Sequence, residues 1–390
     1  MTWRKKVGIY PWHYNQHFEL LQSGEPFFTK LFQSIESAKH EIHFQVYIFE
    51  NDATGKWIFE ALLNAAKRGV KIYIWLDAYG SKGFPAKWQK QLELENAEVN
   101  YFSRFKFAFN FHMGLRLHHK IMLFDQSKAL VGGINISDAY SHIGKTKTWL
   151  DFAIAIEGNV VQDLLRICLH IDKGFLPLIT KQFKKQIYQN ETLHLKARVL
   201  QNHWSRAKFG ISRQYRKNIK KAQEEILLLA SYFLPSPALK RKLKNAAKRG
   251  VKIKLIVGGI SDVPIVKYAS TYFYTDLLQA GVEIWEWQPS VLHAKLTFID
   301  KEWMSIGSYN INHLSDFGST ECNIEIRDQN FQQECISKIK LILKKETIQL
   351  NAADYNRKSG FLKHFRNFIS YHLVNFSFKI LFYLQRGVKS

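Results

Sequence analysis

The sequence predicts an α/β protein made of two pseudo-symmetric α-β-α halves, whose mixed, largely parallel sheets face one shared active site. Three observations support this prediction. The nonapeptide NAAKRGVKI occurs at 64–72 and again at 245–253. Each copy lies inside the same strand–helix–strand pattern, and each half then carries the same spaced set of polar residues. Because the copies lie nearly half a chain apart, they indicate two similar halves rather than a solenoid of short repeats.

The first copy lies in a β-α-β pattern. EIHFQVYIF (41–49) is rich in β-branched and aromatic residues and predicts a strand. TGKWIFEALLNAAKRG (54–69) has apolar residues at helical spacing and ends in Lys-Arg-Gly, which is a helix stop signal. VKIYIWLDAYG (70–80) predicts the next strand. We therefore expect the two strands to pair in parallel through a right-handed crossover.

The second half repeats this plan. EEILLLASYF (224–233) predicts a strand, PALKRKLKNAAKRG (237–250) a helix, and VKIKLIVGG (251–259) the following strand. The repeated nonapeptide is thus the end of a helix and the start of a strand, and we expect its role to be structural. The polar, basic stretch 181–198 is the expected connector between the halves.

We expect three segments: a first half at 1–180, a second half at 181–345, and a basic amphipathic C-terminal segment at 346–390. The net charge is +23, from 56 Lys and Arg against 33 Asp and Glu. Such an excess favours a polyanionic partner, which could be nucleic acid, an anionic membrane surface or a phosphate substrate. Apolar residues make up 46% of the chain, so a sizeable core is available.

Cysteine usage and hydropathy restrict the cellular setting. The three cysteines, Cys168, Cys322 and Cys335, are widely spaced and form no CxxC pair, so we expect neither a disulfide framework nor a zinc site. Reduced thiols fit a cytoplasmic setting. No apolar run follows the basic N-terminus, and no stretch of about 20 apolar residues occurs, so neither a secretory signal nor a transmembrane helix is expected.

The same chemical signature occurs once in each half. HHKIMLFDQSKALVGGIN and HAKLTFIDKEWMSIGSYN both follow the pattern His-x-Lys-x4-Asp-x6-Gly-[Gly/Ser]-x-Asn. Five fixed residues at identical spacing in both halves make a chance match improbable. The first copy comprises His118, Lys120, Asp125, Gly132 and Asn135, and the second comprises His293, Lys295, Asp300, Gly307, Ser308 and Asn310.

These residue types suit a phosphate. His and Lys two positions apart on a strand point to the same face, and the Asn can reach that face across the hairpin. Two such patches could face each other across one phosphate, with one His attacking phosphorus and the other protonating the leaving oxygen. This chemistry needs no metal or cofactor, and the sequence shows no plausible metal cluster. We therefore predict that His118 and His293 are catalytic, that His119 is structural, and that Asp125 and Asp300 either form turns or act directly.

Two acidic residues recur downstream. WLDFAIAIEG and STECNIEI share the pattern acid-x-x-Ile-x-Ile, and their acids are Asp151 and Glu321. A carboxylate against an imidazole N–H fixes its tautomer and stabilises its charged form. We expect each acid to serve a catalytic His, either in its own half or across the pseudo-twofold axis. The alternative is an exposed strand acid, and Glu325 is a weaker candidate for the same role.

The two HxKx4D motifs resemble those of the phospholipase D superfamily, over about residues 7–342. Within it, stretches such as SYFLPSPALKRKLKNAAKRGVKIKLIVGG and LHAKLTFIDKEWMSIGSYN are most similar to the bacterial cardiolipin synthases of the short type. The resemblance implies transfer of a phosphatidyl group between phospholipids through a phosphohistidine, giving cardiolipin or phosphatidylglycerol. It implies that His118 is the nucleophile and His293 the general acid. The resemblance also implies a set of residues that bind the phosphate or support the histidines: Lys120, Lys295, Asn135, Asn310, Ser308, Asp151 and Glu321.

Two departures from the family pattern bear on the choice of acceptor: His119 stands where Arg is common, and the run SYNINHLSDFGSTECN is unusual. Basic and aromatic residues alternate in RFKFAFNFHMGLRLHH (104–119), which suits lipid, nucleic-acid bases or an ordinary buried strand. FLKHFRNFISYHLVNFSFKILFYL (361–384) has Phe361, Phe365, Phe368, Ile369, Leu373, Phe376 and Ile380 at helical spacing.

The C-terminal pattern predicts a helix in a membrane interface, or else one packed on the core or on a second copy. We expect a peripheral protein on the cytoplasmic face of the bacterial membrane. Its expected partners are anionic phospholipids such as phosphatidylglycerol and cardiolipin, with nucleic acid unlikely. The alternatives are a metal-independent nuclease or phosphodiesterase of the same superfamily, and a catalytically silent lipid-binding protein.

Overall fold

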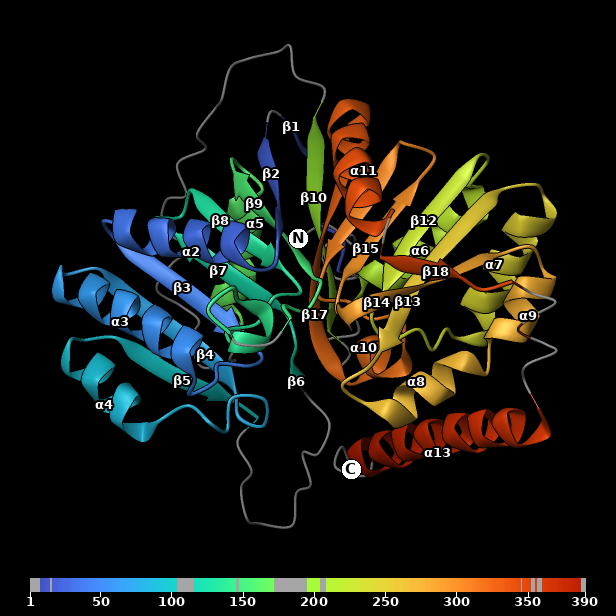
Figure 1. The fold of residues 1–390 in the computed structure, drawn as a ribbon. Helices are drawn as coiled ribbons and strands as arrows, with labels where there is room; N and C mark the ends of the chain where they lie inside the picture. Colours follow the sequence, from blue (N-terminus) through green and yellow to red (C-terminus); the bar gives the residue numbers. More distant parts are fainter. Residues whose placement is uncertain are drawn as a thin grey trace.

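The computed structural model describes residues 8–14, 16–103, 116–144, 147–171, 195–203, 208–344, 346–351, 355 and 360–386. Within these residues it contains two sheets with helices packed around them (Figure 1). The elements of the first half are β1 (His13–Tyr14), β2 (His17–Gln22), α2 (Glu25–Ser37), β3 (Glu41–Val46), α3 (Ala53–Lys67), β4 (Lys71–Asp77), α4 (Ala86–Leu94), β5 (Glu98–Phe102), β6 (Arg116–Leu117), β7 (Lys120–Phe124), β8 (Lys128–Gly132), the 3-10 helix η1 (Asp138–Tyr140), β9 (Phe152–Glu157) and α5 (Val161–Leu169).

The second half repeats this order and extends it. Its elements are β10 (Lys196–His203), β11 (Lys208–Phe209), α6 (Gly210–Lys221), β12 (Glu225–Ala230), α7 (Pro237–Lys248), β13 (Lys252–Ile260), α8 (Pro264–Thr271), α9 (Tyr274–Gln279), β14 (Glu283–Val291), β15 (Lys295–Ile299), β16 (Trp303–Gly307), α10 (His313–Phe317), β17 (Ser319–Arg327), α11 (Gln329–Leu343), β18 (Thr347–Gln349) and α13 (Phe361–Arg386).

The predicted pseudo-symmetry is confirmed by the strand order. The first sheet runs β2-β9-β8-β7-β3-β4-β5, and the second contains the equivalent order β10-β17-β16-β15-β12-β13-β14, with additional strands at its edges. One detail differs from the prediction of largely parallel sheets. Only β3-β4-β5 and β12-β13-β14 pair in parallel, while the other strands of each series pair antiparallel. The reason is that each motif is a hairpin with a short turn, which requires antiparallel neighbours.

The repeated nonapeptide has the structural role that its pattern predicts. It closes α3 and α7 and starts β4 and β13, with Gly69 at φ 89° and Gly250 at φ 91°, a conformation that favours glycine. The arginine of the nonapeptide, Arg68 in the first copy and Arg249 in the second, also has a structural role. Arg68 donates to the Ile35 and Glu36 carbonyl oxygens at the end of α2, and Arg249 donates to the Lys220 and Ala222 carbonyl oxygens at the end of α6. Each arginine thus ties two helix ends together.

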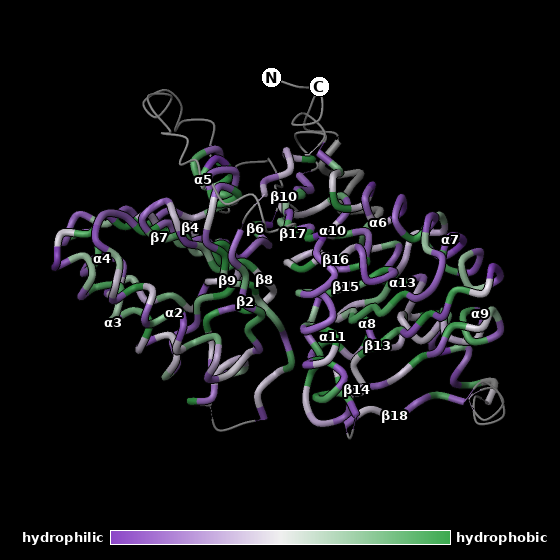
Figure 2. The backbone as a smooth tube through the Cα atoms, turned by 90° about the horizontal axis from the view of Figure 1, so that it is seen from above, coloured by the Kyte–Doolittle hydropathy of each residue, from purple (hydrophilic) through white to green (hydrophobic). Residues whose placement is uncertain are grey.

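Three hydrophobic clusters organise the packing. The central one lies between the two sheets and includes Ile121 and Ile154 from the first sheet, Leu296 and Ile324 from the second, and residues of α5 and α11. The other two lie on the outer faces, under α2, α3 and α4 in the first half and under α6, α7 and α9 in the second. Figure 2 shows the halves side by side, with β8 and β9 turned toward β15 and β16.

The two halves are interlocked by main-chain hydrogen bonds close to both motifs. β6 pairs in parallel with β17, and the N–H groups of His118 and His119 donate to the Thr320 carbonyl at 3.2 and 3.0 Å. On the other side, Leu150 forms an isolated bridge with Leu292, and the His293 N–H donates to the Leu150 carbonyl at 2.8 Å. The chain just before each motif is therefore held by the opposite half.

The C-terminal helix α13 packs along α8 (Figure 1). No helix among the described residues is long and apolar enough to cross a membrane. Residues 172–194, which hold the predicted boundary at 180 and most of the predicted connector, lie outside the described part of the chain. The same is true of most of the basic and aromatic stretch 104–119, of which the structure describes 116–119.

Candidate active site

The motif residues of the two halves meet where the sheets face each other. His118 and His293 immediately precede β7 and β15, and Lys120 and Lys295 are the first residues of those strands. Both lysines are buried, with exposed fractions of 2% and 3%, and each ammonium group donates to the main-chain carbonyl of its own histidine. A buried ammonium group is costly unless an anion compensates it, so the pair favours a bound phosphate.

Each histidine is paired with a carboxylate from the other half. His118 Nδ1 lies 3.0 Å from both carboxylate oxygens of Glu321, and His293 Nδ1 lies 2.6 Å from Asp151 Oδ2. Both carboxylates are fully buried. Because Nδ1 is occupied in each ring, Nε2 is the nitrogen left for chemistry. The pairing across the pseudo-twofold axis therefore occurs at both histidines.

The Gly-Gly and Gly-Ser variants of the motif are explained by these acids. A Cβ at Gly133 would come within 2.4 Å of Asp151 Oδ2, so only glycine leaves room for this carboxylate. The equivalent residue in the second half, Ser308, instead donates its hydroxyl to Glu321, and Ser319 donates to the same carboxylate at 3.0 Å. Ser308 thus positions the acid that positions His118.

Burial perturbs the titration of the whole cluster. It lowers the pKa of His118, although the Glu321 carboxylate opposes this, and burial with the nearby Lys295 and Lys120 lowers the pKa of His293. Burial and mutual repulsion lower the pKa of Lys120 to about 7, and burial lowers that of Lys295 to about 8. Burial also raises the pKa of Asp151 to about 7. A phosphate between the lysines would offset these shifts, because a nearby anion favours the charged ammonium and imidazolium forms.

The two motif asparagines are buried beside the cluster but are placed differently. Asn135 accepts from the Ile48 N–H at 3.2 Å and donates to the Tyr140 hydroxyl at 3.0 Å. Asn310 has a buried side-chain oxygen without a hydrogen-bond partner among the described residues. Asn135 is therefore already committed to protein partners through both of its amide atoms, and its proposed contact with phosphate would require Tyr140 to be displaced or shared.

Asp125 and Asp300 lie away from the cluster, at the far ends of β7 and β15. Both adopt positive φ in the hairpin turns, at 47° and 53°, and both accept main-chain N–H groups. Asp125 binds the N–H groups at 39–41, and Asp300 those at 223–225. A five-residue strand separates each from its lysine by about 16 Å. Of the two predicted roles for Asp125 and Asp300, this placement favours turn formation over a direct part in the chemistry.

The remaining candidates also have structural partners. Glu325 is buried on β17, but its partner is Arg198 at 2.7 Å rather than a histidine. His119 is 1% exposed and its Nε2 lies 2.7 Å from Gln45 Oε1, in agreement with its predicted structural role. No group of three or more His, Cys, Asp or Glu side chains among the described residues is arranged to hold a metal ion.

Aromatic residues surround the two histidines, and the sequence pattern did not predict them. The Tyr47 ring meets His118 edge-on at 5.2 Å, and the Tyr140 and Trp149 rings lie 5.3 and 6.0 Å from His293. The Tyr140 hydroxyl also lies 3.3 Å from His293 Nδ1. The signal was weak: Tyr47 lies near the end of the predicted strand 41–49, and Tyr140 and Trp149 lie in a stretch without periodicity between the motif and the next strand.

The chain resembles known proteins over most of its length. It matches the family described as cardiolipin synthase, PLD-like domain, over residues 31–145 and 215–343. It is 31% identical over 327 residues to cardiolipin synthase B of Salmonella typhi, which covers 83% of this chain and 79% of that protein. It is 30% identical over 330 residues to cardiolipin synthase B of Escherichia coli, again covering 83% of this chain and 79% of that protein.

Two solved structures share the fold. Phosphatidylserine synthase of Haemophilus influenzae superposes with a TM-score of 0.70 at 14% identity, covering 89% of this chain and 91% of that one. Polyphosphate kinase of Porphyromonas gingivalis superposes with a TM-score of 0.58 at 17% identity, covering 86% of this chain and 49% of that one. At these identities the likeness concerns the fold alone.

Proposed function

The chain belongs to the cardiolipin synthase family with phospholipase D-like domains, and from this premise we propose that it makes cardiolipin by transferring a phosphatidyl group between two phosphatidylglycerol molecules. One molecule would donate the phosphatidyl group and lose glycerol, and the other would accept it on a head-group hydroxyl. With free glycerol as acceptor the same chemistry would give phosphatidylglycerol.

In the first step, His118 Nε2 attacks the phosphorus of the donor. A phosphorus–nitrogen bond forms while the bond from phosphorus to the head-group oxygen breaks, and the electron pair goes to that oxygen. His293 Nε2 supplies the proton that the leaving oxygen takes up. The lowered pKa of His118 suits this role, since a neutral imidazole keeps its lone pair near pH 7. The bound phosphate raises the pKa of His293, so that it can carry the proton.

In the second step, the acceptor replaces the departed head group. His293, now neutral, takes the proton of the acceptor hydroxyl, and the oxygen attacks phosphorus. The phosphorus–nitrogen bond breaks and its electron pair returns to His118. Glu321 stabilises the positive charge that His118 gains while it carries the phosphatidyl group, and Asp151 does the same for His293. Lys120, Lys295 and Asn310 bind the non-bridging phosphate oxygens.

The observation that supports this proposal best is the crossed pairing of each histidine with a buried carboxylate of the other half. This pairing supports the proposal, because one chain would then supply both a nucleophile and an acid, with two buried ammonium groups beside them. A binding protein without chemistry would have no need to bury so many ionisable groups together, since each costs stability.

We propose that α13 docks the enzyme on the cytoplasmic face of the bacterial membrane. Its inner face packs on the second half, where Tyr371 stacks on Tyr272 at 4.6 Å and Asn367 is buried. Its outer face is apolar and exposed, with Leu362 at 80%, Leu373 at 51% and Phe376 at 61%. This arrangement supports the proposal, because one face of the helix covers the core and the exposed apolar face could contact lipid.

The activity is tested with phosphatidylglycerol vesicles and the purified full-length chain in the presence of a chelator. We expect cardiolipin and glycerol in equal amounts. Lys295→Met should lower the rate at least about 100-fold through loss of a phosphate contact in a dry site. Lys254→Met, which removes a half-exposed lysine on β13, should not. The proposal fails if the wild-type enzyme forms no cardiolipin, and chelator-resistant cleavage of oligonucleotides that is lost in His118→Ala would favour the nuclease alternative.

Membrane docking is tested by sedimentation with vesicles of phosphatidylglycerol or of phosphatidylcholine. Replacing Leu362, Leu373 and Phe376 together by Ser should weaken binding to the anionic vesicles at least about tenfold, because three partly exposed apolar side chains no longer enter the interface. Leu341→Ser is the matched control, since Leu341 on α11 is 77% exposed but lies away from α13. Equal binding of the two variants would contradict the proposal.

A further inference from the structure

A second group of basic residues lies on β10 and β17, at the ends of these strands that are away from β6. Lys196 is the first residue of β10 and Arg327 is the last residue of β17, and the two lie directly opposite each other in the antiparallel pair. Arg198 and Glu325 form the next pair on the same face, because residues two apart on a strand point to the same side. Like charges opposite each other destabilise a sheet, so the pairing of Lys196 with Arg327 is costly unless an anion compensates it.

These side chains line an open hollow of about 330 Å³, a volume typical of ligand sites. The hollow is formed by Lys196, Arg198 and Arg327 of the two strands, by Gln214 and Lys217 of α6, and by Trp12 from the chain before β1. The Trp12 ring gathers the strand cations. Its centre lies 4.3 Å from the guanidinium carbon of Arg198, 5.8 Å from that of Arg327 and 5.9 Å from the Lys196 ammonium nitrogen. Cation–π attraction to one ring thus offsets part of their mutual repulsion.

The protein does not balance the charge of this hollow. The fully buried carboxylate of Glu325 accepts from Arg198 Nε at 2.7 Å and lies 3.9 Å from Arg327 Nε. Within the described part of the chain, neither Lys196 nor Lys217 forms an ion pair with a carboxylate. Four cations therefore line the hollow against one carboxylate, which is an excess of three positive charges.

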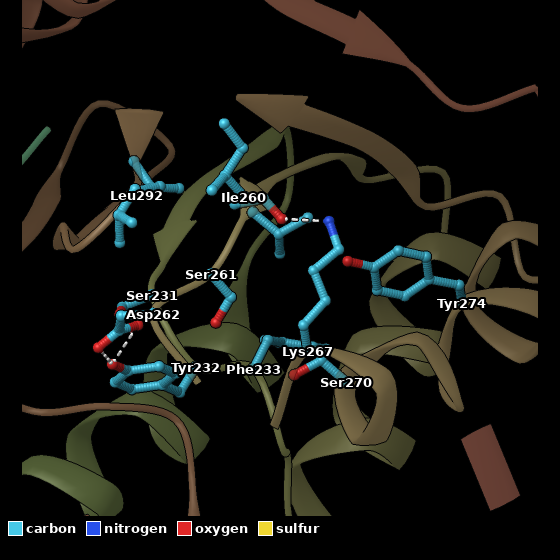
Figure 3. Close-up of a pocket in the computed structure, with 13 residues that line it drawn as sticks. Ser231, Tyr232, Phe233, Ile260, Ser261, Asp262, Lys267, Ser270, Tyr274 and Leu292 are labelled. Carbon is cyan, nitrogen blue, oxygen red and sulfur yellow. Dashed lines mark hydrogen bonds between the residues drawn. The ribbon is translucent and has the colours of Figure 1, made fainter. Parts of the chain in front are cut away.

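The recess at the end of β13 shows the opposite balance. Its cation, Lys267, is held by the Glu286 carboxylate at 3.1 Å and by the Gly258 carbonyl oxygen at 2.7 Å, and Asp262 adds a second carboxylate (Figure 3). The protein itself compensates the lysine there, so that recess gives no reason to expect an anion. The excess of positive charge is a property of the hollow at β10 and β17.

The hollow also presents hydrogen-bond donors that the protein leaves unused. Arg198 is 8% exposed, and only its Nε donates a hydrogen bond within the residues that the structure describes. Gln214 is 6% exposed and lines the hollow, and its side-chain amide has no hydrogen-bond partner among those residues. Buried polar side chains normally have such partners. Phosphate oxygens would accept from both groups, since a guanidinium group forms parallel hydrogen bonds with phosphate.

The hollow is remote from the active site and from α13. Arg327 lies six residues beyond Glu321 on β17, which corresponds to about 20 Å along a strand. Helix α10 contacts α13 and precedes β17, so α13 lies near the opposite end of this strand (Figure 1). A bilayer on the outer face of α13 would therefore meet the other end of β17. This placement favours a ligand dissolved in water over a lipid head group.

We propose that this hollow is a second phosphate-binding site, which takes the phosphate or diphosphate group of a water-soluble molecule. Arg198 binds the phosphate oxygens through its terminal nitrogens, Gln214 donates from its amide, and Lys196 and Lys217 supply point charges. A carboxylate ligand brings one negative charge, whereas a phosphate monoester brings nearly two and so matches the excess better. The site does not depend on the proposed phosphatidyl transfer, because it contains no residue of either motif.

Binding is measured by titration calorimetry of inorganic pyrophosphate into the purified full-length chain at low ionic strength. All variants carry Lys295→Met, which removes one of the two active-site ammonium groups and so weakens phosphate binding there. Adding Lys196→Gln and Lys217→Gln should weaken pyrophosphate binding at least about tenfold, through loss of two charged contacts. Lys248→Gln with Lys252→Gln is the matched control, since it removes two exposed lysines outside the hollow and should leave the affinity within about twofold.

The exposed Lys217 keeps the test independent of folding, because its replacement alone should weaken binding about threefold without disturbing buried contacts. Equal affinities in the two double variants, or no pyrophosphate binding in any of the proteins, would overturn the site. The source of the phosphate is tested by sedimentation with phosphatidic acid vesicles, to which both double variants should bind equally. Weaker vesicle binding of the variant at Lys196 and Lys217 alone would overturn the assignment to a soluble ligand and indicate a lipid head group. Neither outcome depends on whether the enzyme forms cardiolipin.

Discussion

The pairing between Glu321 and His118 makes a quantitative prediction. Glu321→Gln keeps the shape of the side chain and removes its charge. The glutamine oxygen and nitrogen can still exchange hydrogen bonds with Ser308 and Ser319, so the fold around the site should persist. What changes is the partner of His118 Nδ1, which now lies 3.0 Å from both carboxylate oxygens.

The magnitude follows from the charge that His118 gains. When the phosphorus–nitrogen bond forms, the ring becomes positive, and its charge centre lies about 4 Å from that of the carboxylate. With an effective dielectric constant of about 20, the lost attraction is about 4 kcal/mol. This corresponds to a loss of about 10³-fold in the rate of phosphatidyl-enzyme formation. The KM for the lipid should change little, because the lysines and not Glu321 contact the phosphate.

The assay is a single turnover of phosphatidyl p-nitrophenol, whose leaving group needs no protonation, so that only the nucleophilic step is measured. Glu325→Gln is the matched control: it lies four residues along the same strand and is equally buried, but it pairs with Arg198. We expect Glu325→Gln to lower the free energy of unfolding by a few kcal/mol, because Arg198 loses its buried partner. Its burst rate per folded enzyme should stay within about threefold of wild type. A Glu321→Gln rate within tenfold of wild type, or an equal loss in both variants, would refute the role of Glu321.

Three further predictions concern residues outside the chemistry. Asp300→Asn should lower the free energy of unfolding by about 1–3 kcal/mol, because a charged acceptor of main-chain N–H groups is lost. The kcat per folded enzyme should stay within about threefold of wild type. A 100-fold loss of kcat would instead indicate a direct role of Asp300 in the chemistry. Burial lowers the pKa of His119 to about 3, so the unfolded chain binds a proton below pH 6.5 that the folded chain does not, and wild-type stability should fall by up to about 1.4 kcal/mol per pH unit between these values. In urea titrations the free energy of unfolding of His119→Gln should depend less steeply on pH over this range than that of wild type. Parallel pH dependences of the two proteins would contradict the burial argument. Arg249→Ala should lower the free energy of unfolding by about 1–3 kcal/mol, because the carbonyl groups at the end of α6 lose their donor. Arg241→Ala, on the exposed side of α7, should lower it by less than about 0.5 kcal/mol. Equal losses in the two variants would show that the contact of Arg249 with these carbonyl groups contributes nothing to stability.

Much of the fold was predictable because the same pattern of strands and helices occurs in both halves of the sequence. The strands and helices around the nonapeptide follow local rules of periodicity and helix ending, and the observed β3-α3-β4 and β12-α7-β13 units match them within a few residues. The predominance of antiparallel pairs was not predicted, because the strands that flank each hairpin are separated from it by long loops. Nothing in their local pattern specifies which edge they join.

The candidate site was predictable for the residues that recur and not for those that break the symmetry. The positions of Asp151 and Glu321 follow from the repeated acid-x-x-Ile-x-Ile pattern. Only the interlocking of β6 with β17 and of Leu150 with Leu292 explains why each acid contacts the histidine of the opposite half. Ser231 carries no sequence signal of its own. Only the strand registers show that its position is equivalent to that of Tyr47 in the first half.

The measurement that tests the central claim most directly is to trap and locate the phosphatidyl-enzyme. Wild type, His118→Asn and His293→Asn are mixed with labelled phosphatidyl p-nitrophenol, quenched in alkaline detergent to preserve the phosphorus–nitrogen bond, and digested for mass spectrometry. We expect His293→Asn to accumulate label on His118, because the acceptor can no longer be deprotonated, and His118→Asn to take up none. Label on His293 in the His118→Asn variant, or no labelled enzyme in any of the three, would contradict this expectation.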